Sequence, residues 1–142
     1  MTQPEPLPLD AMKAYGYKGI GELAERMGIE FLELSTERTV ARMPVAGNTQ
    51  PVGLLHGGAS VVLAESLGST AAALHAGPER LAMGIEINAT HSGAATDGWV
   101  TGVCTPIHLG RTLATHQIEI TDERGRRICT VRMTNILTDR KK

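Results

Sequence analysis

The stretch from Leu55 to His75 constrains the fold of this chain more than any other segment. Its interior is nearly all Ala, Val, Leu, Ser and Gly, and Glu65 is its only charged residue. A long helix with so little polar surface must be buried on most sides by something curved and apolar. Aromatic residues make up only 3% of the chain, so the surrounding core must be aliphatic. We therefore predict a helix over residues 55–75 at the centre of the molecule.

Strand-like segments stand on both sides of this helix in the sequence. The last four follow one another closely, with turn-forming residues at 95–99, 108–111 and 122–126. Sequential strands joined by short turns are typical of an antiparallel meander. We expect an α+β fold in which one antiparallel β-sheet wraps around a long central helix. The predicted strands are residues 29–34, 38–44, 82–95, 99–108, 112–121 and 127–137.

The length of the chain, 142 residues, suits one domain with a real core. Three prolines among the first nine residues disfavour regular structure there. Residues 10–27 are expected to form one or two short helices. We predict an N-terminal arm and short helix over residues 1–19, followed by a single domain over residues 20–142.

Charge and composition exclude several classes of partner. The net charge of −1 argues against nucleic acid and anionic membranes, since both favour basic proteins. No apolar run approaches the roughly 20 residues that span a bilayer, and the N-terminus does not resemble a secretory signal, so we expect a cytoplasmic location. Cys104 and Cys129 lack the spacing of a metal or redox motif and are expected to be buried, reduced thiols. No metal site is predicted, because no His-Glu-x-x-His or Cys-His cluster is present.

The beginning and the middle of the predicted helix carry the residues suited to chemistry. His56, Gly57 and Gly58 open the helix, where free amides and the macrodipole favour negative charge. The Gly57 amide is the natural donor to a carbonyl oxygen, because glycine allows close approach to the backbone. Glu65, in its apolar stretch, is a candidate base or nucleophile, and Ser69 lies one helical turn further on the same face. This arrangement indicates acyl chemistry.

Structural interpretations of the same residues compete with the functional ones. In the structural interpretation, Glu65 is a salt-bridged carboxylate in the core. However, no Lys or Arg lies within a helical turn of it. In the same interpretation, His56 only caps the helix. His75, His108 and His116 are expected at the surface or in turns.

The spacing of Gly57 and Glu65 predicts a dimer. Eight residues along a helix correspond to about 12 Å, whereas reacting groups must lie within about 3.5 Å of each other. Two copies of the helix, packed antiparallel about a two-fold axis, would bring Gly57 of one copy near Glu65 of the other. We therefore expect an obligate homodimer with two sites at its interface.

Three segments carry a resemblance to a known family. They are Q-P-V-G-L-L-H-G-G-A-S-V-V-L-A-E-S-L-G-S at 50–69, G-I-E-I-N-A-T-H at 84–91 and P-I-H-L-G-R at 106–111. Together they resemble the hotdog-fold acyl-CoA thioesterases, and among these the Glu-dependent bacterial subgroup of the phenylacetate-pathway, 4-hydroxybenzoyl-CoA and enterobactin-type proofreading thioesterases. The last of these is the most similar. The resemblance spans roughly residues 20–137 and implies the hotdog fold, thioester hydrolysis without metal or bound cofactor, and a homotetramer of two dimers.

The resemblance implies a catalytic role for each matched position of the helix and its leading loop. Gly57 would polarise the thioester carbonyl through its amide, and Glu65 would be the nucleophile or general base. Gln50 and His56 would position the thioester, and Ser69 would support Glu65 or the attacking water.

Substrate-binding residues are expected on two later segments. The resemblance implies that His91 lines the acyl or pantetheine channel. The basic turn at 108–112 offers a guanidinium, a glycine and a hydroxyl, which suit a CoA phosphate group. Its candidate residues are His108, Gly110, Arg111 and Thr112.

Two other functions remain open from the sequence: a non-catalytic acyl-CoA-binding hotdog protein, and a hotdog enoyl hydratase or dehydratase. Fold alone cannot separate them from a thioesterase. The sequence also leaves open the acyl group, the choice between CoA and a carrier protein as the thiol, and the choice between a covalent anhydride and direct attack by water.

Overall fold

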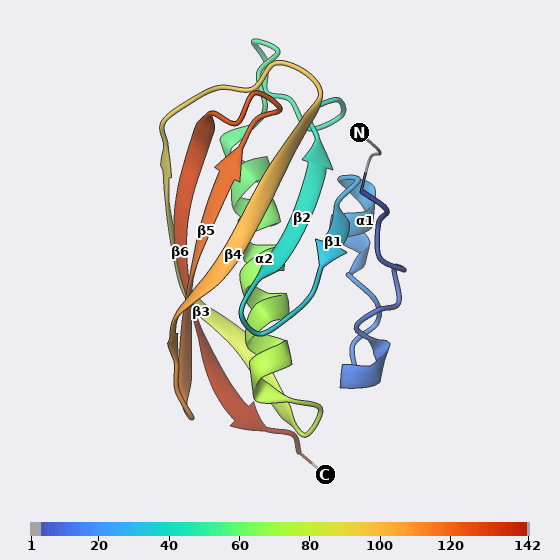
Figure 1. Cartoon of the computed structure of the whole chain (residues 1–142), viewed down its shortest axis with the longest axis vertical. Coiled ribbons are helices and arrows are strands. Elements are labelled where there is room, and N and C mark those ends of the chain that lie inside the picture. The colour runs from blue at the N-terminus through green and yellow to red at the C-terminus, as the bar shows by residue number, and fades with distance from the viewer. Residues whose placement is uncertain (1–3, 142) are drawn as a thin grey trace.

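One antiparallel sheet and one long helix make up most of the computed structural model, which describes residues 4–141 (Figure 1). The sheet has six strands in the order β1-β2-β4-β5-β6-β3. A single helical turn at Lys13–Tyr15 precedes the named elements. In chain order these elements are α1 (Glu22–Arg26), β1 (Glu30–Glu33), β2 (Thr39–Pro44), α2 (Gly57–Ala76), β3 (Arg80–His91), β4 (Trp99–Leu109), β5 (Leu113–Thr121) and β6 (Arg127–Asp139).

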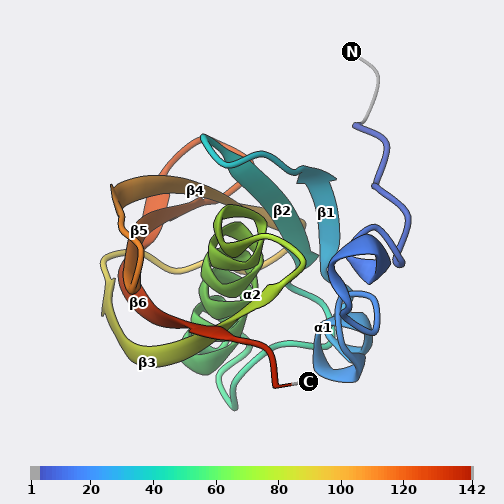
Figure 2. The same ribbon diagram turned by 90° about the horizontal axis from the view of Figure 1, so that it is seen from below.

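The sheet curves around α2, as the view along the helix shows (Figure 2). Leu63 and Leu67 of α2 are fully buried against Ile118 and other aliphatic residues of the inner face. The helix lies so close to the sheet that a Cβ atom on Gly102 of β4 would be 2.5 Å from Leu67 Cδ1. Glycine therefore makes the close packing possible. The predicted α+β fold with a sheet wrapped around a central helix is confirmed.

The position of β3 corrects the predicted meander. Strands β4, β5 and β6 do pair in sequence, but β3 pairs with β6 along Arg80–His91 and forms the far edge of the sheet. Residues 92–98 therefore cross from one part of the sheet to another and do not form a hairpin turn. The predicted strand over 82–95 also ends earlier, at His91.

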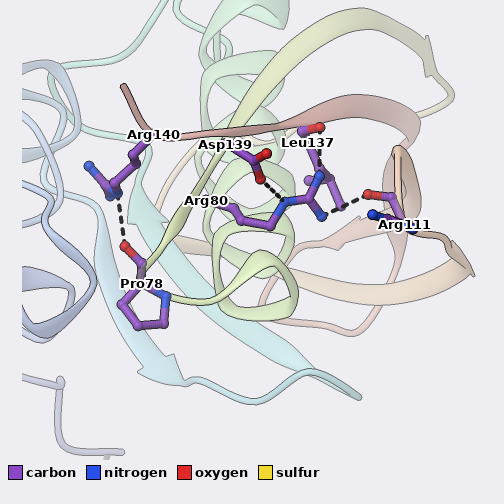
Figure 3. Close-up of polar contacts among 6 residues, drawn as sticks. All are labelled: Pro78, Arg80, Arg111, Leu137, Asp139 and Arg140. Atoms are coloured by element: carbon purple, nitrogen blue, oxygen red, sulfur yellow. Dashed lines mark hydrogen bonds and ion pairs between the residues drawn. The ribbon is translucent and has the colours of Figure 1, made fainter. Parts of the chain in front are cut away.

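The N-terminal segment is hydrogen-bonded to β1 and to the C-terminal segment. The Leu7 amide donates a hydrogen bond to the Phe31 carbonyl (2.7 Å). Near the C-terminus, Arg140 donates to the carbonyls of Tyr15 (2.6 Å) and Pro78 (2.9 Å), and the latter bond is drawn in Figure 3. The division of the chain between residues 19 and 20 stays a prediction.

Both cysteines are free and buried, as expected. Burial raises the pKa of the Cys104 thiol to about 12. Within residues 4–141, no helix has the length and apolar character needed to cross a membrane. The same residues contain no group of three metal-ligating side chains that could hold an ion.

Candidate active site

The start of α2 is fixed by its leading loop and by a side-chain cap. The Leu55 amide donates to the Ala95 carbonyl (2.8 Å) and the His56 amide donates to the Asn48 carbonyl (2.9 Å). The Gly58 amide donates to His56 Nδ1 at 2.8 Å, so His56 is the N-cap of α2. The capping function weighed in the sequence is therefore present, and the exposed face of the ring remains available to a ligand.

Gln50, Gly57 and His91 line one cavity of about 150 Å³ at this end of the helix. The imidazole of His91, from β3, lies directly against Gly57: a Cβ atom there would be 3.1 Å from His91 Nε2. Position 57 thus leaves little room for a side chain beside His91, and the amide of this first helical residue has no acceptor within the helix. Three of the predicted site residues come together here within one chain.

The Gln50 side chain is held in a defined orientation. Its Oε1 accepts a hydrogen bond from the Val52 amide (2.6 Å), and its backbone amide donates to the Leu54 carbonyl (2.8 Å). With its oxygen engaged in the turn, the side chain has its NH₂ group left as the donor for a ligand.

Glu65 lies elsewhere. It lines a separate cavity of about 260 Å³ together with Met133 and residues 84–87 of β3. The sequence suggested a carboxylate in a buried wall, but in the single chain the Glu65 side chain is exposed to solvent beside the edge strand. Glu65 and Gly57 therefore do not meet within one chain, as their separation of about 12 Å along the helix requires.

Ser69 lines a third cavity, of about 220 Å³, between α2 and the N-terminal segment. Thr70 and Ala73 of the helix share this cavity with Tyr17, whose buried hydroxyl has no hydrogen-bond partner among the residues that the structure describes. The predicted support of Glu65 by Ser69 thus stays a prediction, because the two side chains line different cavities of the chain.

The turn at 108–112 lies near the opposite end of α2 from Gly57. His75 Nε2 is 2.7 Å from the Gly110 carbonyl oxygen, and Arg80 donates to the Arg111 carbonyl at 2.8 Å (Figure 3). His108, Arg111 and Thr112 are exposed, whereas Gly110 is half-buried. The structure does not bring this turn to the cavity of Gly57 within the same chain.

Sequence reasoning misplaced one polar residue and missed another. His116, expected at the surface or in a turn, is only 1% exposed, and Asn135 is fully buried. The alternation along β5 was the available signal, since Ala114, Ile118 and Ile120 share the inward face with His116. Burial, together with the nearby His75, lowers the pKa of His116 to about 4.

Comparisons with known proteins agree with this architecture. A family model described as "Thioesterase superfamily" matches residues 52–129. The proofreading thioesterase EntH of Cronobacter turicensis is 46% identical over 124 residues, which cover 87% of this chain and 90% of the relative. The 1,4-dihydroxy-2-naphthoyl-CoA hydrolase of Escherichia coli is 46% identical over 132 residues, covering 92% and 95%.

Solved structures give the same result. Thioesterase HI1161 from Haemophilus influenzae superposes with a TM-score of 0.82 at 33% identity, covering 98% of this chain and 96% of that one. A mutant of thioesterase PA1618 from Pseudomonas aeruginosa superposes with a TM-score of 0.82 at 38% identity, covering 96% and 97%. Fold, helix motif and relatives agree, and the chain is a thioester hydrolase that belongs to the Thioesterase superfamily.

Proposed function

We propose that this protein hydrolyses acyl-CoA thioesters at two sites in a homodimer, with Glu65 as the essential carboxylate. The observation that carries the proposal is the division of the site residues within one chain. Gln50, Gly57 and His91 line one cavity, while Glu65 lines another further along the same helix. A second copy of the chain supplies the missing half of each site.

The edge strand β3 supports a two-fold arrangement. It is the last strand of the sheet, and its Met83 and Ile85 side chains are each 57% exposed. An uncovered edge with apolar side chains is a surface on which another strand can pair. Glu65 lies beside this edge, so pairing of two β3 strands would enclose the carboxylate. Assembly of two dimers into a tetramer is a further proposal, based on the family resemblance.

The chemistry follows from the two halves. The Gly57 amide and the α2 dipole would polarise the thioester carbonyl, and His91 and the Gln50 amide would hold the thioester in place. Glu65 of the second copy would take a proton from water as the water oxygen bonds to the carbonyl carbon. The C–S bond then breaks, and Glu65 gives its proton to the leaving sulfur, so that the thiol departs and the carboxylate is restored. Alternatively, the Glu65 carboxylate attacks the carbonyl carbon directly, the thiolate leaves as the C–S bond breaks, and water then hydrolyses the resulting anhydride.

For the substrate, we propose an aromatic acyl group on CoA. The relative from Escherichia coli is named for hydrolysis of 1,4-dihydroxy-2-naphthoyl-CoA. The cavity beside Ser69 and Tyr17 offers space next to the helix for an acyl group. The exposed turn at 108–112, with Arg111, would bind CoA phosphate. A panel of aryl, aliphatic and enoyl thioesters of CoA and of a carrier protein tests the substrate class.

Replacing Glu65 by Gln tests the mechanism. We expect the E65Q variant to lose at least about 100-fold in kcat, because general acid–base groups contribute this much, while it remains folded and dimeric. The matched control is E86Q, since Glu86 lines the same cavity from β3, and it should retain most of the activity. Wild-type turnover by E65Q would refute the role of this carboxylate. Tight binding of acyl-CoA by the wild-type protein without turnover of any thioester would indicate a binding module instead.

A further inference from the structure

Within residues 4–141, two polar side chains of the sheet, Asn135 and His116, are buried without hydrogen-bond partners. Asn135 of β6 is fully buried, and neither its Oδ1 nor its Nδ2 has a partner. His116 of β5 is 1% exposed, and both of its ring nitrogens lack partners. Leaving such a group unpaired costs about 1 to 3 kcal/mol, so native proteins rarely bury one without a function for it.

The two side chains are neighbours on the face of the sheet that packs against α2. Asn135 is directly opposite Ala114 on β5, and His116 is opposite Met133 on β6. His116 and Asn135 are therefore diagonal cross-strand neighbours, within reach of each other for long side chains. Together they form a buried polar pair in an otherwise aliphatic inner face.

On its other side, Asn135 approaches Glu65. Gly84 of β3 is the residue opposite Asn135 in the β3–β6 pairing. A Cβ atom on Gly84 would lie 3.8 Å from Asn135 Oδ1 and also 3.8 Å from Glu65 Oε1. The amide and the carboxylate thus border the same small space, which a side chain at position 84 would occupy.

We propose that Asn135 is a positioning residue for the catalytic carboxylate. Its NH₂ group donates to Glu65, directly or through one water molecule, and the buried His116 is its diagonal neighbour on β5. This inference rests on the proposed role of Glu65. A turn of the amide by 180° presents its nitrogen to the carboxylate. The neutral ring of His116, favoured by a pKa of about 4, places no charge beside the amide.

The Asn135→Leu variant tests the inference. Leucine has a similar size but no hydrogen-bonding group, so we expect kcat to fall about 10- to 100-fold through misplacement of Glu65, with KM little changed. Stability should change little, because the buried amide that is removed makes only the proposed bond to Glu65. A purely structural role would instead lower stability and leave kcat of the folded protein intact. The Asn135→Ser variant, which can still hold a water molecule, should recover part of kcat and serves if the leucine variant does not fold.

The matched control is Thr134→Val. Thr134 is adjacent on β6 and bonds to Thr115 at 3.0 Å, and its side chain points to the other face of the sheet. This variant should keep wild-type kcat.

A double-mutant cycle separates the two proposals. If Asn135 acts through Glu65, adding N135L to E65Q should cause no further loss of kcat. Losses that multiply would overturn the inference, as would a fully active N135L beside an inactive E65Q, and in both cases the proposed function would stand. A fully active E65Q would overturn the proposed function and this inference together.

Discussion

The His116 imidazole is buried between the sheet and α2, where its neutral form is favoured, so it makes stability depend on pH. Its folded pKa is lowered from 6.5 to about 4. Between these values the unfolded chain binds a proton that the folded protein does not, so stability falls as the pH is lowered from about 6.5 to about 4. The loss should approach about 3 kcal/mol.

Urea unfolding of wild-type protein and a His116→Leu variant at pH 7 and pH 4.5 checks this prediction. The variant should lose less stability between the two pH values than the wild type. Replacement of the neighbouring Thr134 by Val, which removes no titratable group, is the control and should leave the pH dependence unchanged. Equal pH dependence of wild type and His116→Leu would contradict the assignment.

At the scale of a single element, His56 at the start of α2 caps the helix and is also proposed to contact the thioester. His56 accepts a hydrogen bond from the Gly58 amide, so we expect His56→Ala to cost about 1 kcal/mol of stability. His56→Asn should retain the cap and most of the stability. If the imidazole also contacts the thioester, both variants should lose activity alike, as thermal unfolding and steady-state kinetics would show. Full activity in the asparagine variant would show that His56 caps the helix and has no further role in catalysis.

The elements also show what local sequence can predict. The composition of 55–75 sufficed for α2, because a helix of small and aliphatic residues has no other stable place than the core. The pairing of β3 with β6 could not be predicted from local sequence, because β4 and β5 lie between these two strands in the chain. The exposure of Glu65 in one chain was missed for a similar reason, since local pattern does not distinguish an interface from a core. The candidate site residues from Gln50 to Glu65 could be proposed from the sequence because their chemistry and spacing are local.

At the scale of the whole molecule, the edge strand β3 is the surface on which the proposed dimer depends. Ile85 is exposed in the single chain, so Ile85→Lys should affect the stability of one subunit by no more than about 0.5 kcal/mol. It should nevertheless weaken the dimer and reduce activity, which sedimentation and kinetics at matched concentration would measure. Leu23→Lys on α1, where Leu23 is 58% exposed, is the control. A dimer that persists in the Ile85 variant with full activity would contradict pairing through β3.

Complementation between two inactive variants tests whether each site is shared by two chains. One variant is E65Q, and the other is Gly57→Val, whose side chain would collide with His91. In a mixed dimer one site carries both defects and the other carries neither. Random reassociation makes about half of the dimers mixed, each with one intact site, so the mixture should recover about a quarter of wild-type activity. A mixture of E65Q with a chain that carries both changes has no intact site and should stay inactive. If each site belonged to one chain, both mixtures would be inactive, since no chain would carry both groups.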